Sequence, residues 1–317
     1  MTRFLLFRLF QVVLVLAIMS FVIYGLIGLM PGDPVDLMLT SNPHLSAADV
    51  ARLRALQGLD QPLLSRYLAW GAAALQGDFG YSRLYVQPAV SALLPRLGNT
   101  ALLMGTSFVL AFGIALAAGI AAARRPGSRI DSLVSLLSFS GISVPPFWLG
   151  LMLILVFAVT LGWLPAGGIV EVGKGGFLDR LRHLILPVTT LTLVEAASLV
   201  RFVRAAMIEA LGQDYVRTAR AKGADETRVL WSHALRNAMI PIVTVVALSF
   251  GGLFSGALVT ETIFAYPGMG KLIYDAILGN DFNLALAGLL FATLVTLLAN
   301  LAADIAYAVI DPRISYT

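Results

Sequence analysis

Long apolar stretches dominate the pattern of hydrophobic and polar positions along the chain. A helix that crosses the hydrocarbon core of a bilayer needs about 20 mostly apolar residues, because lipid offers no hydrogen-bond partner to an open backbone. Stretches that are long enough and carry no charged residue lie at Leu9–Met30, Leu97–Ala123, Ser132–Val170, Asn237–Thr260 and Phe282–Ala303. We expect each of them to form a membrane-spanning helix.

Two further features complete the predicted set of spans. The third stretch is interrupted by Pro145-Pro146, and neither part is long enough to span alone. We therefore expect one helix that is kinked at the prolines. The segment Leu184–Met207 is apolar except for Glu195 and two arginines near one end, where long side chains can reach the headgroups. The pattern thus predicts an all-α, polytopic membrane protein with six transmembrane helices.

Composition excludes several other classes of protein. Apolar residues make up 58% of the 317 residues and charged residues only 13%, against roughly a quarter charged in an average soluble domain. So few charges cannot form the polar shell of a soluble enzyme.

The net charge is +4 and there is no cysteine. The basic residues adjoin apolar stretches instead of clustering with aromatic residues, so we expect no nucleic-acid partner. Three histidines lie far apart, and we expect no catalytic, cofactor-binding or metal site.

Lysine and arginine residues predict the orientation, because they accumulate in cytoplasmic loops. One set of loops carries 13 of them and the opposite short loops carry four, which places both termini in the cytoplasm.

The first apolar stretch has 22 residues, longer than the roughly 7–15 of a secretory signal, so we expect an uncleaved helix. The predicted organisation is a first span at residues 1–30, a small helical extracytoplasmic insertion at 31–96, and a core of five spans at 97–313. A cytoplasmic loop lies at 209–236.

The cytoplasmic loop has its own helix signals. Asp214 is a suitable N-cap, Tyr215–Lys222 contains helix-forming residues, and Gly223 can supply the left-handed residue that ends a helix. Asp225 can cap a second short helix that runs to about Leu235. We therefore expect two short helices joined at a glycine corner.

Two interpretations of this loop are open. A basic helix can lie on anionic lipid at the membrane surface. Alternatively, the small residues Ala219, Ala221 and Gly223 leave the backbone approachable, so that a partner protein can grip the helix while the arginines pair at the rim of the contact.

A family resemblance favours docking. The segment Asp214-Tyr-Val-Arg-Thr-Ala-Arg-Ala-Lys-Gly223 resembles the cytoplasmic coupling loop of binding-protein-dependent ABC importer permeases, whose motif is Glu-Ala-Ala, three residues and Gly. Arg217-Thr-Ala219 stands in the place of Glu-Ala-Ala, and Leu235-Arg236 in that of a later Leu-Pro. This form is similar to the "B" subunit of the dipeptide/oligopeptide/nickel permease subfamily. Further matching stretches are Met30-Pro-Gly-Asp-Pro34, Leu56–Leu63, Ser143–Trp148, Thr260–Gly270 and Asp311-Pro-Arg313.

The resemblance implies a type I ABC importer permease fold in the bacterial inner membrane and a role in importing short peptides or a related small solute. It implies as partners a second homologous permease, two cytoplasmic ABC ATPase subunits and an extracytoplasmic solute-binding protein. ATPase closure would then move the docked helix as a lever. The residues that the resemblance assigns to ATPase coupling are Asp214, Tyr215, Arg217, Thr218, Ala219, Arg220, Ala221, Lys222 and Gly223.

Glu195 is a separate candidate, because an ionisable residue near the middle of a span is costly and typically functional. Either it lines the translocation path, where it would contact an amine or a cation, or it hydrogen-bonds to a Ser/Thr or Arg of another helix.

Two other functions compete with an importer permease. One is a stand-alone secondary transporter or channel, which predicts inverted repeats or several intramembrane charges, and the other is an intramembrane enzyme. An intramembrane enzyme needs paired catalytic side chains within the spans, and none is evident.

Overall fold

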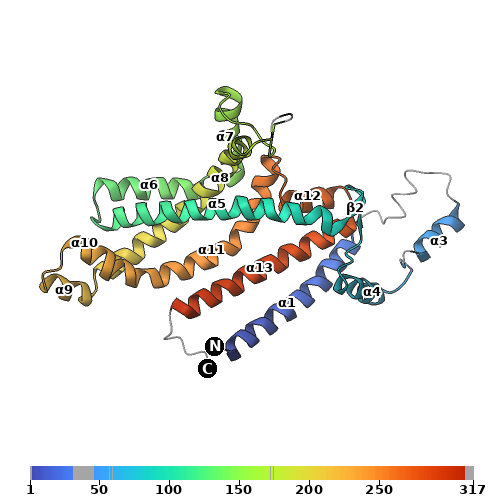
Figure 1. Ribbon diagram of the computed structural model, residues 1–317, viewed down its shortest axis with the longest axis horizontal. Coiled ribbons are helices and arrows are strands. Elements are labelled where there is room, and N and C mark those ends of the chain that lie inside the picture. The colour runs from blue at the N-terminus through green and yellow to red at the C-terminus, as the bar shows by residue number, and fades with distance from the viewer. Residues whose placement is uncertain are drawn as a thin grey trace. The chain divides into compact units, whose positions relative to one another are not determined.

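The computed structural model describes residues 2–30, 46–56, 58, 60–171, 173 and 175–310, and these are almost entirely helical (Figure 1). Five of the described helices are long and apolar enough to cross a membrane, and a bent pair of helices makes six if it counts as one span. The prediction of an all-α, polytopic chain is confirmed. Most of the motif Met30–Pro34 and all of Asp311-Pro-Arg313 lie outside the described residues.

The chain divides into two compact units. The first comprises the described residues up to Leu97 together with Leu272–Val295, and the second comprises Gly98–Lys271 and the described residues from Thr296 onward. Two long helices, α5 (Ala89–Ala123) and α13 (Phe282–Ile310), contribute to both units, as does the short α12 (Met269–Leu278).

The first unit contains α1 (Thr2–Gly28), α3 (Ala47–Leu56), α4 (Leu63–Leu75) and a hairpin of β1 (Tyr81–Ser82) and β2 (Gln87–Pro88). Beyond Gln11, helix α1 is apolar on nearly all sides and little of it is buried, as suits a helix that faces lipid. The buried carboxylate of Asp281 ties the hairpin to the start of α13. It accepts hydrogen bonds from the Ser82 hydroxyl at 2.6 Å and from the Leu84 amide at 2.9 Å.

The second unit is arranged around α8 (Phe177–Leu211). Its neighbours are α6 (Arg129–Ser143), α7 (Pro146–Leu153) and α11 (Arg236–Ile263). Buried residues of α8, among them Leu199, Val203 and Met207, pack with Leu230 and Ile242 in one apolar cluster. At Gly141 of α6, a Cβ would lie 2.7 Å from the Cβ of Ala197, so this glycine allows α6 and α8 to approach closely.

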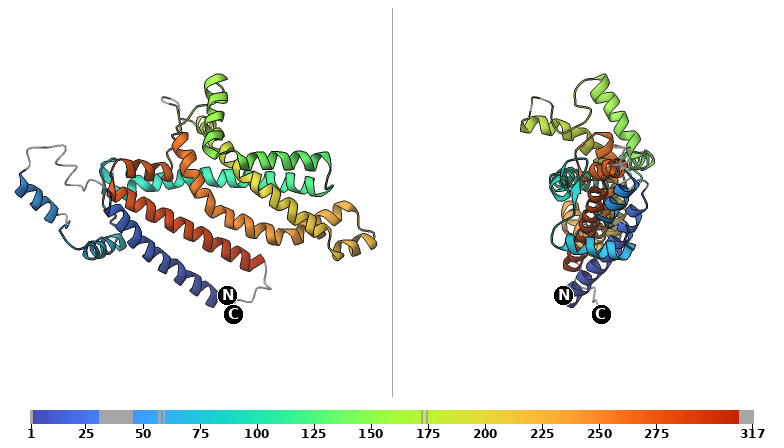
Figure 2. Two further views of the ribbon diagram at one scale, coloured as in Figure 1. Left: turned by 180° about the vertical axis from the view of Figure 1, so that it is seen from behind. Right: turned by 90° about the vertical axis from the view of Figure 1, so that its right-hand side faces the viewer.

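The proline pair produces a sharper feature than the predicted kink. Helix α6 ends at Ser143, and the segment formed by α7 and the π-helical turns η1 (Ile154–Thr160) leaves it at 101° (Figure 2). The expectation of one kinked helix is therefore wrong. The residue before a proline avoids the helical region, and Val144 and Pro145 both adopt extended backbone with ψ of 122° and 135°. Two successive extended residues separate the helices completely.

The candidate coupling hairpin and its supporting contacts

The predicted cytoplasmic loop forms a helical hairpin at one end of the second unit, between α8 and α11 (Figure 1). Its first helix is α9 (Asp214–Ala221). The N-cap is Gln213, so the expectation that Asp214 is the N-cap is wrong. Asp214 instead lies in the first turn, where a negative charge is favourable next to the helix dipole, and its carboxylate is 3.4 Å from Nη1 of Arg217.

The corner of the hairpin follows the sequence prediction. Gly223 has φ of +82°, which a residue with a side chain adopts only at a cost. Asp225 caps the next helix by accepting a hydrogen bond of 2.6 Å from the amide of Arg228. The second helix does not stop near Leu235, however. The segments α10 (Glu226–Arg228) and η2 (Val229–Leu235) continue into α11, because Leu235 and Arg236 keep helical backbone.

A small apolar cluster holds the two arms of the hairpin together. Val216 and Val229 are fully buried, and Ala219 is 7% exposed in the same cluster. Ala219 therefore packs inside the hairpin, whereas Ala221 is exposed on its outer face. The two alanines, which the sequence motif groups together, have different surroundings.

The outer face of the hairpin is polar and carries charges of both signs. Its exposed side chains include Asp214, Tyr215, Arg217, Thr218, Arg220, Ala221 and Lys222 on the first arm and Asp225, Glu226 and Arg228 on the second. Arg220 pairs with Glu226 across the corner through two hydrogen bonds, Nε to Oε1 at 2.8 Å and Nη2 to Oε2 at 3.0 Å. These bonds raise the pKa of Arg220. Partial burial, reinforced by the charge of Glu209, raises the pKa of the Tyr215 phenol, which stays neutral at physiological pH.

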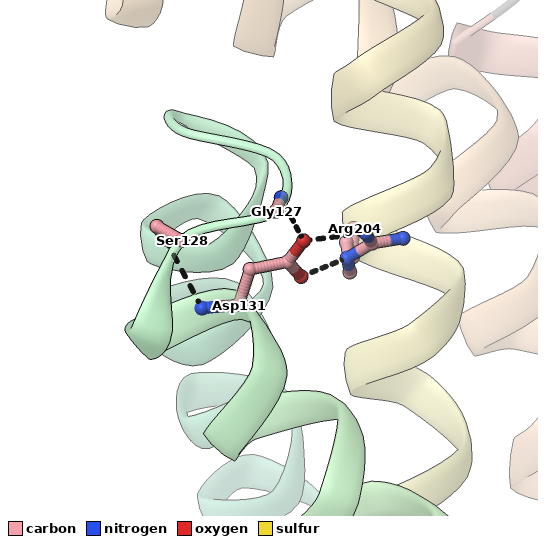
Figure 3. Close-up of polar contacts among 4 residues, drawn as sticks. All are labelled: Gly127, Ser128, Asp131 and Arg204. Atoms are coloured by element: carbon pink, nitrogen blue, oxygen red, sulfur yellow. Dashed lines mark hydrogen bonds and ion pairs between the residues drawn. The ribbon is translucent and has the colours of Figure 1, made fainter.

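An ion pair that sequence reasoning missed joins α8 to the first turn of α6 (Figure 3). Arg204 donates from Nε to Asp131 Oδ1 at 2.5 Å and from Nη2 to Oδ2 at 2.8 Å. Asp131 is 4% exposed and also accepts a hydrogen bond from the amide of Gly127, while Ser128 caps α6 by accepting from the amide of Asp131. An Asp three residues after a Ser N-cap is a recognisable helix-start pattern. Nothing in the sequence indicates its partner 73 residues later.

The side chain of Glu195 is partly buried on α8 and hydrogen-bonds to Ser249 of α11. This contact is the kind that the structural interpretation of Glu195 predicts.

A second buried carboxylate, also missed from the sequence, organises the turn after α11. Glu261 is fully buried, accepts a hydrogen bond of 2.5 Å from the Thr100 hydroxyl and another of 3.0 Å from the Lys271 amide. Gly268 and Gly270 pack directly against it. Thr100 also accepts a hydrogen bond from the amide of Met269 at 2.7 Å. The Glu and the two glycines all lie in the Thr260–Gly270 motif, but the motif alone does not reveal that they touch.

Among the described residues, no group of three or more His, Cys, Asp or Glu side chains could hold a metal ion. The buried acidic groups described above are instead engaged by protein donors.

Comparison with known proteins identifies the family. Residues 113–316 match the family described as "binding-protein-dependent transport system inner membrane component", and residues 1–89 match its N-terminal family. The oligopeptide transport system permease protein AppB of Bacillus subtilis (strain 168) is 42% identical over 307 residues, which cover 96% of each chain. The glutathione transport system permease protein GsiC of Escherichia coli (strain K12) is 40% identical over 316 residues, which cover all of both chains.

Solved structures agree at the level of the fold. The methionine ABC transporter MetNI in an inward-facing conformation has a TM-score of 0.57 at 19% identity and covers 70% of this chain and 97% of its own. An amino acid ABC transporter with histidines has a TM-score of 0.51 at 15% identity and covers 69% of this chain and 92% of its own. The chain belongs to the binding-protein-dependent transport system inner membrane components and is a multi-pass permease subunit of a bacterial ABC importer, not itself a catalyst.

Proposed function

We propose that this permease forms half of a translocation pathway for short peptides or a closely related small solute. Two relatives that align over nearly the whole chain support this solute class, because one is named for oligopeptide and the other for glutathione transport, and glutathione is itself a short peptide. Uptake of labelled peptides by cells that express the complete importer tests the proposal. We expect unlabelled peptides to compete with the uptake of the labelled ones and free amino acids not to compete.

The partners that we propose are a second homologous permease, two cytoplasmic ABC ATPase subunits that hydrolyse ATP, and an extracytoplasmic solute-binding protein. We also propose the division into a first span at residues 1–30, an extracytoplasmic insertion at 31–96 and a core at 97–313 with a cytoplasmic coupling loop at 209–236. The match of both family descriptions, which split the chain into an N-terminal and a C-terminal part, is compatible with this division.

The helical hairpin is proposed as the contact with the ATPases. The observation that carries this proposal is its construction: an internal apolar cluster keeps it compact while its outer face stays exposed and polar. The second arm runs without interruption into α11. A push on the hairpin would therefore reach a membrane span as a rigid movement, which is what a switch between inward-open and outward-open states requires.

Two alanines provide a matched test. Ala221→Leu adds bulk on the exposed outer face and should abolish stimulation of the ATPase subunits by solute and binding protein, while the permease stays as stable as wild type. Ala219→Leu adds the same bulk inside the hairpin and should overpack it, at a cost of about 1–3 kcal/mol. Its first effect should be a lower apparent melting temperature of the permease without ATPases.

The measurements are ATPase stimulation and thermal stability of the purified importer and permease. Ala221→Ser, which keeps the side chain small, serves as the control and should behave as wild type. Normal coupling in Ala221→Leu, with the ATPases still bound, would show that the outer face is not the docking contact.

Glu195 is proposed to face the translocation path and to contact an amine or cation of the solute. Its place in a span and its only partial burial support this role.

A further inference from the structure

Arg201 of α8 has no role in the function proposed above. Its side chain is exposed, and the described residues provide it with no carboxylate partner. Its guanidinium carbon lies instead over the ring of Phe139 on α6, 4.4 Å from the ring centroid. An exposed and unpaired charge within a span is costly in lipid, so a polar environment must surround this side chain when the importer is assembled.

The direction of Arg201 follows from the way in which α6 packs on α8. The first turn of α6 is joined to Arg204 by the ion pair, whereas Gly141 near the end of α6 packs on Ala197, so the two helices are antiparallel. Phe139 lies two residues from Gly141 and is therefore level with residues of α8 that come before Arg201. Helical side chains lean toward the N-terminal end of their own helix. Arg201 thus points toward the middle of the span.

This direction argues against a lipid headgroup as the partner of Arg201. An arginine near the end of a span usually extends outward, so that its charge reaches the headgroups. Here the nearer headgroups lie at the end of α8 that carries the hairpin, and the guanidinium is turned away from that end.

The face of α8 that carries Arg201 is mostly polar or small. Ser198 and Ala205 are exposed on it, Glu195 is partly buried at its opposite edge, and Phe202 is its one exposed large apolar side chain. With 3.6 residues per turn, these five positions fall within about one third of the helix circumference. A surface with an acid, a hydroxyl and a guanidinium suits water and a polar solute better than acyl chains. We refer to these five residues as the polar face of α8.

We propose that the polar face of α8 lines the translocation path and that Arg201 binds the C-terminal carboxylate of the transported peptide. This inference rests on the proposed function, in which Glu195 contacts the amine of the solute. Guanidinium groups bind carboxylates through parallel hydrogen bonds. The Phe139 ring offers no conventional hydrogen-bond acceptor, so its contact with Arg201 leaves those donors available.

The spacing of the two charges suits a short peptide. Glu195 and Arg201 are six residues apart, which is about 9 Å along the helix axis. An extended peptide covers about 3.3–3.6 Å per residue, so a chain of two or three residues can present its amine to one side chain and its carboxylate to the other.

Arg201→Gln tests the carboxylate contact with two forms of one peptide. The complete importer, reconstituted in liposomes and saturated with loaded binding protein, is given a labelled dipeptide with a free carboxylate or the same dipeptide as its C-terminal amide. A hydrogen bond to a charged group is worth roughly tenfold in a binding equilibrium. Maximal uptake of the free acid should fall by about that factor, whereas uptake of the amide should not change.

Two further variants control this comparison. Arg201→Lys keeps the positive charge and should restore most of the uptake of the free acid. Arg129→Gln removes an exposed arginine from the first turn of α6, away from the polar face, and should behave as wild type with both peptides.

The outcomes separate this inference from the proposed function. If wild type imports both peptides and Arg201→Gln lowers their uptake equally, or lowers neither, the carboxylate contact is refuted while peptide import stands. An equal loss is also what pairing of Arg201 with an acidic residue of the second permease would give. If wild type imports no peptide, the proposed function fails and the inference fails with it.

A second test asks whether water reaches the polar face, and the absence of cysteine from this chain makes it direct. Ser198→Cys lies on the polar face, and Leu137→Cys lies within about one turn of the same depth on α6, where Leu137 is 63% exposed. A charged, hydrophilic thiol reagent should modify Ser198→Cys in the assembled importer roughly tenfold faster or more, because the reactive thiolate forms in water and not in lipid. Mass spectrometry of this chain measures the modification. Equally slow modification of both variants would show that lipid or the second permease covers the polar face, and would overturn the proposal.

Discussion

At the scale of single residues, two carboxylates show how a nearly uncharged chain uses the few charges it has. Asp131 receives two hydrogen bonds from Arg204 and one from the Gly127 amide, and it is almost inaccessible to solvent. Glu261 receives hydrogen bonds from Thr100 and Lys271 and is fully buried. A buried charge is tolerated only when donors of this kind surround it, so both residues fix the positions of segments that are distant in sequence.

Arg204→Lys should lower the stability of the permease although it keeps the charge. Lysine offers a point charge where arginine supplies two parallel donors, so one of the two hydrogen bonds from residue 204 to Asp131 would be lost. We expect a loss of about 1–3 kcal/mol, measured as a lower apparent melting temperature in detergent. In a double-mutant cycle, Arg204→Met with Asp131→Asn should cost less than the sum of the single changes. Additive effects would mean that the two side chains do not act as a pair.

Glu195→Gln separates the two roles of that residue. Glutamine has the same shape and can keep the hydrogen bond to Ser249, but it removes the negative charge. If the carboxylate contacts the solute's amine, solute uptake should fall while assembly and melting temperature stay near wild type. Ser249→Ala is the companion variant, and it should affect stability more than uptake. Unchanged uptake in Glu195→Gln would eliminate the pore-lining role.

At the scale of elements, the helices are joined by corners whose shape depends on a few glycine and proline residues. Gly223 permits the turn of the helical hairpin, and the pair at Pro145 separates α6 from α7. The turn after α11 depends on close approach: a Cβ at Gly270 would lie 2.6 Å from the Cα of Leu258 and 2.9 Å from Oε2 of Glu261.

Gly270→Ala should therefore destabilise this turn, by about 1–3 kcal/mol, because neither neighbour can move freely. Gly113→Ala in α5 provides the contrast. A Cβ at Gly113 meets nothing within 4 Å, and alanine is favoured over glycine in a helix by about 1 kcal/mol, so this variant should be neutral or more stable. Thermal unfolding of the two variants in the same detergent measures both effects, and a stable Gly270→Ala would refute the tight packing of the turn.

At the scale of the whole molecule, the permease performs only one part of solute import. A chain that belongs to this family contributes the membrane pathway, and we propose that energy and solute selection come from other chains. Reconstituted alone in liposomes, the permease should show no solute uptake with or without ATP. Uptake should appear when the second permease, the ATPases and the binding protein are added, and it should require ATP hydrolysis. Uptake by the chain alone would favour a stand-alone transporter.

The sequence by itself determined the uninterrupted spans, the glycine corner and the Asp225 cap. Backbone groups in lipid must form their hydrogen bonds within the span, and the conformational limits of a single residue act locally, so a local pattern reveals all three. Only the tertiary structure decided which alanine of the hairpin is buried and which donors surround Asp131 and Glu261. Those outcomes depend on contacts between residues far apart in the chain, such as Asp131 with Arg204. The strength and geometry of such contacts leave no local pattern in the sequence.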